Sequence, residues 1–187
     1  MNVPSNSGRR RFLGYAVTFL GGIGAALGTI PFLRSWRNRQ PIPTLDVDVS
    51  KMVDGQLIAV QWPFGPNTVY ILKRSPAAVA SLRTPDPKLA DANSDESQQP
   101  VGAKNPLRSI RPDFLVVGAH CTHLGCNVGH VAKGQVEWFP VGGFMCPCHG
   151  SMYDFAGRVY QHQAAPTNLV VPKYRFLNDH TIQLGRE

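Results

Sequence analysis

The sequence predicts an all-β head carried on a single N-terminal transmembrane helix. Two observations point to this class. An uncharged apolar run covers residues 12–33, and from residue 56 onward short apolar segments alternate with Gly, Pro and Asn. The length of 187 residues, with 43% hydrophobic and 17% charged residues, suits a folded domain with an added segment.

The basic residues gather beside the apolar run instead of spreading over the head. The formal net charge is +7, and no acidic residue precedes Asp46. Six arginines flank the run: Arg9, Arg10, Arg11, Arg34, Arg37 and Arg39. From Pro41 onward, 13 basic residues stand against 12 acidic ones. A nucleic-acid-binding domain carries its excess charge on the fold itself, so we expect a membrane partner and no nucleic acid.

The run from Phe12 to Leu33 is long enough for a membrane span. As a helix its 22 residues reach ~33 Å, against ~30 Å for a hydrocarbon core. A cleavable signal peptide has a shorter apolar core of ~7–15 residues and a small-residue cleavage site. This run is longer and ends without such a site. We therefore predict a retained single-span anchor over residues 12–33.

Residues 1–11 contain an export pattern. Arg9-Arg10-x-Phe12-Leu13 fits the twin-arginine signal, whose pathway moves folded proteins. The alternative is a positive cluster that orients the helix, but three arginines also follow the span. We interpret residues 1–11 as a cytoplasmic twin-arginine segment, with the head on the periplasmic side of a bacterial inner (cell) membrane.

The next segments are predicted from their turn and cap residues. Residues 34–48 resemble a semi-rigid linker or hinge with prolines at 41 and 43, and residues 49–187 form the head. A hairpin is expected from strands 56–62 and 68–74 around a turn at 63–67. The remaining segments of this part are a short helix over 75–83 with Ser75 as its N-cap, a polar surface loop over 83–105 and a buried strand over 113–120.

Further short strands complete the predicted head. They cover residues 135–140, 142–146, 151–155, 169–171, 173–177 and 181–184. Many short strands separated by turn residues are typical of a sandwich or barrel-like domain.

All four cysteines lie in two short boxes that also contain histidine. These boxes are "CTHLGC" at 121–126 and "CPCHGS" at 146–151. A disulfide framework would leave both histidines unexplained. Zinc is a second alternative, although the Cys-x-His spacing is tight for it, and a plant-type cluster needs a C-x₂-C pair that the second box lacks. One assignment uses every residue: a [2Fe-2S] cluster held by two cysteines and two histidines, with two cysteines left over.

The paired boxes resemble those of the Rieske iron–sulfur proteins. The similarity runs from the anchor through residues 47–62 to the C-terminal strands and is greatest to Rieske subunits of bacterial cytochrome bc complexes. It implies an antiparallel Rieske-type sandwich with a small cluster-binding subdomain at about 119–166. It also implies a translocase-type oxidoreductase of the respiratory chain, the quinol–cytochrome c reductase.

The resemblance further implies a role for each box residue. The cluster ligands would be Cys121, His123, Cys146 and His149. A disulfide would join Cys126 to Cys148. Ser151 and Tyr153 would donate hydrogen bonds to cluster sulfur, and Leu124 would shield the cluster at a loop tip. His149 and His123 would be the catalytic histidines, since a ligand imidazole can take a proton as the cluster takes an electron.

The resemblance also implies partners: cytochrome b, a c-type cytochrome and quinol, in a complex expected to be dimeric. One departure concerns the loop that covers the cluster in the family. Here residues 163–169, "QAAPTNL", keep only Ala165 and Pro166 of its pattern, and Met152 stands where histidine is common. Two other functions remain open at this point: a Rieske carrier of another exported oxidoreductase, such as arsenite oxidase, and a zinc-stabilised binding module.

Overall fold

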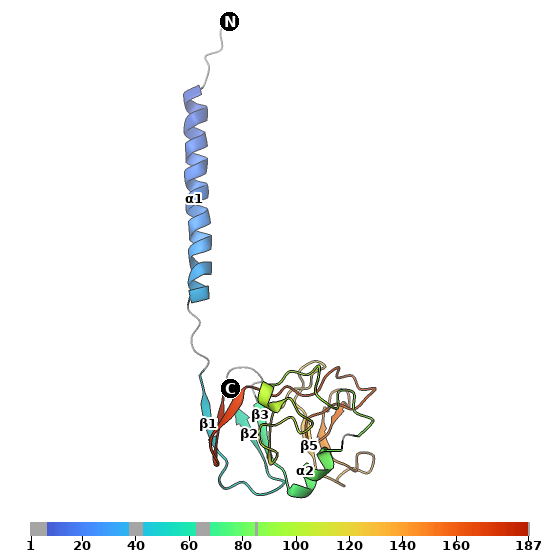
Figure 1. Cartoon of the computed structure of the whole chain (residues 1–187). Helices are drawn as coiled ribbons and strands as arrows, with labels where there is room; N and C mark the ends of the chain where they lie inside the picture. The colour runs from blue at the N-terminus through green and yellow to red at the C-terminus, as the bar shows by residue number, and fades with distance from the viewer. Residues whose placement is uncertain (1–6, 38–42, 63–67, 85, 187) are drawn as a thin grey trace. The chain divides into compact units, whose positions relative to one another are not determined.

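A computed structural model describes residues 7–37, 43–62, 68–84 and 86–186 (Figure 1). The chain divides into two compact units, Met1–Pro41 and Ile42–Glu187. The first contains helix α1 (Ser7–Arg37), and the second contains the strands. A long apolar helix followed by antiparallel sheets confirms the predicted fold class.

Helix α1 is longer than the predicted span. It begins at Ser7 and ends at Arg37, with Pro31 inside it. Arginine is a good helix former, so the flanking arginines continue the helix beyond the apolar run. Among the described residues, one helix is long and apolar enough to cross a membrane, over Ser7–Ser35. The first six residues of the twin-arginine segment lie outside the described part.

The linker prediction over 34–48 is wrong at both ends of its range. Residues 34–37 belong to α1, and strand β1 occupies Leu45–Asp48. Its alternating Leu-Asp-Val-Asp residues pair antiparallel with β9 (Thr181–Leu184), with Val47 opposite Ile182. The part over residues 38–42 lies outside the described residues.

The central hairpin follows the prediction. Strands β2 (Leu57–Gln61) and β3 (Thr68–Lys73) pair antiparallel, and β3 also pairs with β4 (Phe114–Gly118). The turn at 63–67 lies outside the described residues. Helix α2 (Pro76–Leu82) begins after Ser75, whose hydroxyl accepts a hydrogen bond from Ala78 N at 3.2 Å.

Two predicted strands are wrong. Residues 135–140 form successive tight turns, in which Phe139 N donates to Val136 O. Residues 169–171 belong to no strand. Leu169 N donates to Gly157 O and Val171 N to Gln98 O, so their bonds go to separate segments. In addition, β5 (Gly129–Val131) was not predicted.

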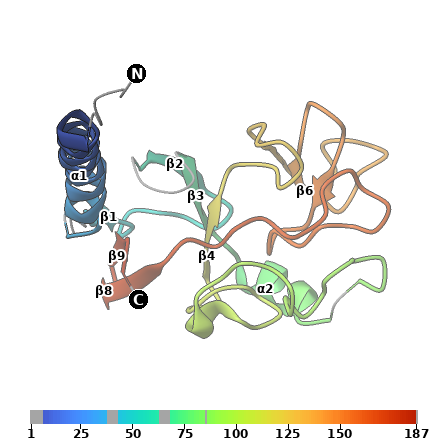
Figure 2. The ribbon, with the colours of Figure 1, turned by 90° about the horizontal axis from the view of Figure 1, so that it is seen from above.

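The described strands form three antiparallel sheets of three strands each. Their orders are β1-β9-β8, β2-β3-β4 and β5-β6-β7, with β6 at Gly143–Met145, β7 at Met152–Tyr153 and β8 at Tyr174–Asn178. Figure 2 shows β8 and β9 on one side of the central sheet and β6 on the other. Because β4 is buried along its whole length, both faces of the central sheet are covered.

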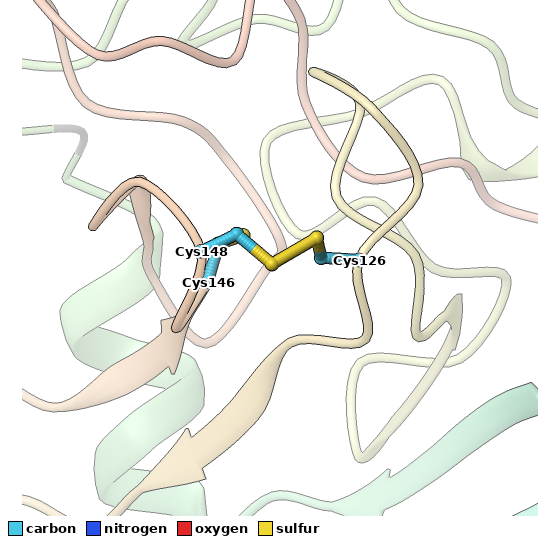
Figure 3. Close-up of side chains that lie close together, drawn as sticks. All are labelled: Cys126, Cys146 and Cys148. Carbon is cyan, nitrogen blue, oxygen red and sulfur yellow. A yellow bond between two sulfur atoms is a disulfide. The ribbon is translucent and has the colours of Figure 1, made fainter.

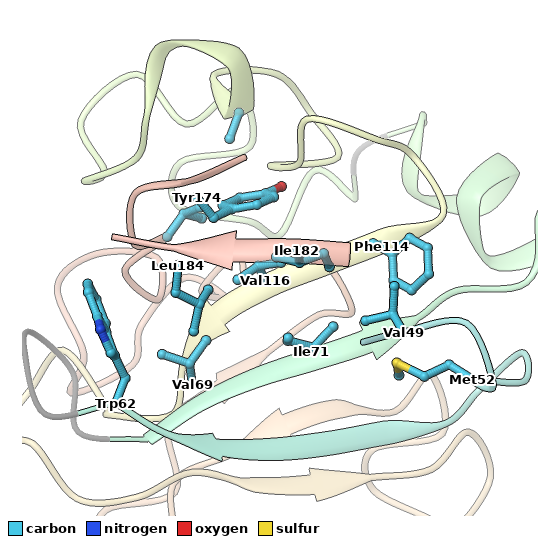
Figure 4. Packing of buried hydrophobic residues seen from close by; sticks show 12 residues of the cluster. Val49, Met52, Trp62, Val69, Ile71, Phe114, Val116, Tyr174, Ile182 and Leu184 are labelled. Atoms are coloured by element: carbon cyan, nitrogen blue, oxygen red, sulfur yellow. The ribbon is translucent and has the colours of Figure 1, made fainter. Parts of the chain in front are cut away.

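The two faces of the central sheet form separate cores. Val69, Ile71 and Val116 point toward the β1-β9-β8 sheet and pack with Ile182 and Leu184 (Figure 4). The other face contributes Leu72, Leu115 and Val117 to a second core. That core also contains Cys121 and Cys146, so the first cysteine of each box packs on the face of the central sheet opposite the β1-β9-β8 sheet.

Candidate functional site

The two boxes are loops with the same backbone hydrogen bonds. The first follows β4, and the second connects β6 to β7. Cys121 N donates to Cys126 O at 2.8 Å, and Cys146 N donates to Ser151 O at 2.8 Å. Each loop therefore closes over six residues and projects its middle residues away from the core.

Each loop closes through a glycine in the left-handed region. Gly125 has φ 80° and Gly150 has φ 73°. Their N–H groups donate to Cys121 O and Cys146 O, both at 2.9 Å. A side chain at either position would strain this conformation. The glycines thus fix the sharp turn that follows each histidine.

A disulfide joins Cys126 to Cys148 and ties the loops together (Figure 3). This is the pair that the resemblance implied. The Cys146 sulfur lies within 4.8 Å of both disulfide sulfurs. Bonded sulfurs no longer serve as thiolate ligands, so of these three cysteines only Cys146 can bind a metal.

The four residues expected to be ligands remain free of that disulfide. Cys121 and Cys146 are buried free thiols, 3% and 1% exposed. The rings of His123 and His149 meet edge to face with their centroids 4.8 Å apart. His149 is exposed, whereas His123 is half-buried. The fold thus brings two thiols onto one core and two imidazoles beside each other at the loop tips.

One ring nitrogen among these four residues is buried without a hydrogen-bond partner in the described structure. The Nδ1 of His123 is buried and has no hydrogen-bond partner among the described residues. Buried polar atoms are nearly always satisfied, so an unpaired ring nitrogen here points to a ligand. The Nδ1 of His120 is also buried and unpaired in the described part, and nothing in the sequence pattern had singled this residue out.

Tyr153 lies against Cys121. Its hydroxyl is 3.2 Å from Cys121 Sγ and accepts from Thr122 N at 3.3 Å. Burial, followed by the hydrogen bond with Cys121, raises the pKa of Tyr153 above its usual value. The phenol therefore keeps its proton at physiological pH and can donate it to the sulfur.

Ser151 has a fully buried hydroxyl that links the second box to residues 163–169, here named the cover segment. Ser151 Oγ accepts from Ala165 N at 3.1 Å. A hydroxyl that accepts still has its proton to donate. On the other side, Thr122 Oγ1 donates to Thr167 O at 2.6 Å. The cover segment is thus bonded to both boxes, and Thr122 is a site residue that our sequence reasoning missed.

Leu124 lies at the tip of the first loop. It is 74% exposed, next to exposed Gly125. It does not lie in the core that holds Cys121 and Cys146.

Comparison with known proteins decides the family. Residues 100–175 match the model of the Rieske [2Fe-2S] domain. The ubiquinol-cytochrome c reductase iron-sulfur subunit of Allochromatium vinosum is 43% identical over 97% of this chain and 90% of its own. This chain belongs to that family of iron-sulfur subunits. The subunits of Rhodospirillum rubrum and Blastochloris viridis are 37% and 35% identical, over 96% and 95% of this chain and 92% of each of theirs.

The cofactor of the Rieske domain is a [2Fe-2S] cluster, and the residues of this site fit it. Two thiols and two imidazoles are the donor set that distinguishes Rieske clusters from four-cysteine clusters. Both free thiols are buried, and His123 Nδ1 is buried without a partner in the described residues. The three relatives named above share the description of the quinol enzyme's subunit, which is not that of an arsenite oxidase.

Proposed function

We propose that this chain is the electron-transfer subunit of a quinol–cytochrome c oxidoreductase. The observation that carries the proposal is the disulfide-clamped pair of loops, which gathers two buried thiols and two neighbouring imidazoles. Its 43% identity to a ubiquinol-cytochrome c reductase subunit supports the same activity.

The proposed cluster ligands are Cys121, His123, Cys146 and His149. The buried thiols would hold the inner side of the site, and the imidazoles the outer side, because His149 is the exposed member. When bound, the cluster supplies a one-electron acceptor whose potential is raised by two neutral imidazoles in place of thiolates.

The proton of quinol is assigned to a ligand histidine. His149 is exposed at the loop tip, so its free ring nitrogen can accept a hydrogen bond and then the proton from quinol. His123 lies beside it, with ring centroids 4.8 Å apart, and can act in the same way. Tyr153 and Ser151 support electron acceptance, since hydrogen bonds to sulfur stabilise the more negative reduced state.

The proposed partners follow from the exposed loop tips. Leu124, 74% exposed, would pack against the quinol site of cytochrome b and keep water from the histidines. A c-type cytochrome would receive the electron, and the whole complex would be dimeric. Helix α1 would anchor the chain in the bacterial inner membrane after twin-arginine export, with the head in the periplasm.

We propose the same division of the chain that the sequence suggested, with a shorter linker. Residues 1–11 stay cytoplasmic, 12–33 span the bilayer, and the head follows with its cluster-binding subdomain at about 119–166. The linker that the sequence predicts would serve as the hinge that lets the head pass from quinol to cytochrome, although its residues 38–42 lie outside the described part. Residues before Leu45 are the part available for it, because β1 is paired with β9.

Spectroscopy of the intact complex tests the ligand set. Replacing His149 by Ala should abolish the low-average-g EPR signal of a reduced Rieske cluster. The controls His130→Ala and His162→Ala should keep that signal, since neither histidine belongs to a box. A retained signal in the His149 variant, or zinc in place of iron and acid-labile sulfide, would refute the assignment.

A further inference from the structure

The polar stretch between α2 and β4 is tightly bonded to the other end of the head. Residues 86–109, here named the strap, contain only one short helical element, η1 (Val101–Ala103). Yet Ser94 and Arg108 are fully buried within it. Ala90 N donates to Val159 O at 2.9 Å, and Gln161 N donates to Lys88 O at 2.7 Å. The strap is therefore part of the packed structure.

Arg108 is the centre of these contacts. One of its terminal nitrogens donates to Ala156 O at 3.3 Å and Gly157 O at 3.0 Å. The other donates to Gln99 Oε1 at 3.3 Å and Leu169 O at 2.6 Å. One guanidinium thus joins the strap, the turn after β7 and the last residue of the cover segment.

The backbone of Arg108 indicates that this placement is specific. Its φ is 50°, a conformation that non-glycine residues rarely adopt and that costs about 1–3 kcal/mol. The Cβ of an alanine at Gly157 would lie 3.2 Å from the Arg108 guanidinium and 3.4 Å from Leu169 Cβ. Gly157 also has φ 70°, so its backbone conformation and these close contacts together favour glycine in the turn after β7.

Asn168 forms a second set of hydrogen bonds between the cover segment and the strap. Its amide nitrogen donates to Asp91 O at 2.9 Å and Ser94 Oγ at 3.2 Å, and its backbone N donates to Ser97 Oγ at 3.3 Å. Its side-chain oxygen accepts from Val159 N at 2.8 Å. Residues 168 and 169 are therefore held from the strap side by side chains and backbone together.

The other end of the cover segment contacts the two boxes. Ala165 N donates to Ser151 Oγ, and Thr167 O accepts from Thr122 Oγ1, beside the Tyr153 hydroxyl. Leu169 packs in the core that contains Cys121 and Cys146. A shift of residues 165–169 would consequently disturb both hydroxyls that are placed to donate to cluster sulfur.

We propose that Arg108 is a positioning residue for the cluster, which acts by fixing the cover segment against the two boxes. The inference deepens the proposed function and rests on its ligand set. It also explains how this chain keeps a firm cover segment although only Ala165 and Pro166 of the family pattern remain. The stiffness comes from the strap, through Arg108 and Asn168.

The charge of Arg108 adds a second component that the test must separate. Its hydrogen bonds in the described structure go to neutral oxygens, and Asp154 is ion-paired with Arg158 instead. Burial lowers the pKa of Arg108 to about 10, so the cation persists at neutral pH. A buried positive charge favours the more negative reduced cluster.

Three variants in the intact complex separate these components. Arg108→Met removes both the positive charge and the planar guanidinium with its several N–H donors. Arg108→Lys keeps the charge, but one ammonium group cannot bridge three segments. The matched control is Arg74→Met. Arg74 is 2% exposed, and it bonds to Leu107 O and Ser109 Oγ in the strap and to Phe114 O in β4, but its hydrogen bonds do not reach the cover segment.

We expect both Arg108 variants to speed amide hydrogen exchange in a peptide covering residues 163–169, to lower the reduction potential and to shorten cluster lifetime several-fold. Arg74→Met should lower thermal stability without these three effects. If Arg108→Met does not accumulate as a folded chain, the milder Lys variant carries the test.

Unchanged exchange at 163–169 in the folded Arg108 variants would overturn the inference, as would equal effects in the Arg74 variant. A potential that falls only in Arg108→Met, with exchange unchanged, would assign the effect to charge and also overturn positioning. Failure of the proposed function would be seen separately. The unsubstituted chain would then lack the EPR signal of a Rieske cluster, or the His149→Ala variant would keep that signal unaltered.

Discussion

The hydroxyl of Tyr153 lies 3.2 Å from the Sγ of Cys121, inside the same core. The Thr122 hydroxyl has its own short bond to Thr167 O at 2.6 Å, which commits the Thr122 proton. The backbone N–H of Thr122 occupies an acceptor position on the tyrosine oxygen. The phenol proton therefore has two acceptors within reach, Cys121 Sγ at 3.2 Å and Thr122 Oγ1 at 3.3 Å, and the first prediction tests its bond to the sulfur.

Tyr153→Phe should lower the reduction potential while the fold persists. The ring remains to fill its buried position, and one hydrogen bond of about 1 kcal/mol is lost from stability. The shift should be on the order of tens of millivolts, since a tenfold change in a one-electron equilibrium is about 59 mV. Redox titration followed by EPR measures it.

Tyr174→Phe is the matched control for that experiment. Tyr174 is also fully buried, but its hydroxyl accepts from Ile110 N at 2.9 Å in the other core. Its removal should cost stability and leave the potential unchanged. Equal potentials in the wild-type and Tyr153→Phe chains would show that the phenol does not act on the cluster.

Removal of the disulfide should release the cluster more readily. The bridge spans 22 residues, and closing a loop of that size contributes about 3 kcal/mol in the chain-entropy account. The double variant Cys126→Ser/Cys148→Ser is required, because a single change frees a thiol within 4.8 Å of Cys146. We expect lower iron content and a lower thermal midpoint. A double variant with full iron content would contradict the role of this clamp.

Gly143→Ala should prevent folding of the second box. Gly143 has φ 142°, and an added Cβ would overlap the carbonyl oxygen of Tyr153 on the neighbouring strand. We expect a loss of more than about 4 kcal/mol, measured by denaturant unfolding. Gly134→Ala is the control, since nothing lies within 4 Å of its Cβ position; it should cost only about 1–2 kcal/mol for its φ of 73°.

Protonation of Asp91 in acid should weaken the hydrogen bonds of the strap around Asn168, whose side-chain nitrogen donates to Asp91 Oδ2 at 3.3 Å. Partial burial raises the pKa of Asp91, but bonds from the Ser97 hydroxyl and the amides of Asp95 and Glu96 outweigh it and lower the pKa below 3.8. A carboxyl with a depressed folded pKa contributes stability above its unfolded pKa, and this is lost as the pH falls through the folded value. The midpoint advantage of wild type over Asp91→Asn should therefore be largest near neutral pH and shrink below pH 3.8. A constant difference would contradict this linkage.

The features that the sequence predicted well have local causes. The Ser75 cap, the hairpin strands and the two boxes each depend on residues close together in the sequence, so they can be predicted without knowing the fold. The boxes also predicted the family, which the 43% identical relative confirms. The ligand roles of Cys121, His123, Cys146 and His149 stay a prediction until the cluster is measured.

Where the prediction was wrong, the structure depends on long-range contacts or on glycines at positive φ. Strand β1 is only four residues long and depends on β9, far along the chain. Residues 135–140 have a strand-like apolar content, yet they lie between Gly134 and Gly142, both at positive φ, and Trp138 is 63% exposed. Arg108 gave no local signal, because its partners are at positions 99, 156, 157 and 169.

The shared backbone of the two boxes has a consequence for how their chemistry differs. Counted from the first cysteine, the third position is a ligand candidate, His123, in one loop and a disulfide cysteine, Cys148, in the other. The sixth position is Cys126 in one and Ser151 in the other, the first a covalent tie and the second a hydroxyl bonded to the cover segment. One six-residue pattern of backbone hydrogen bonds is thus used twice, and the two loops differ in the side chains that stand at equivalent positions. The disulfide therefore joins the sixth position of the first loop to the third position of the second, so the tie between the loops does not follow the symmetry of their backbones.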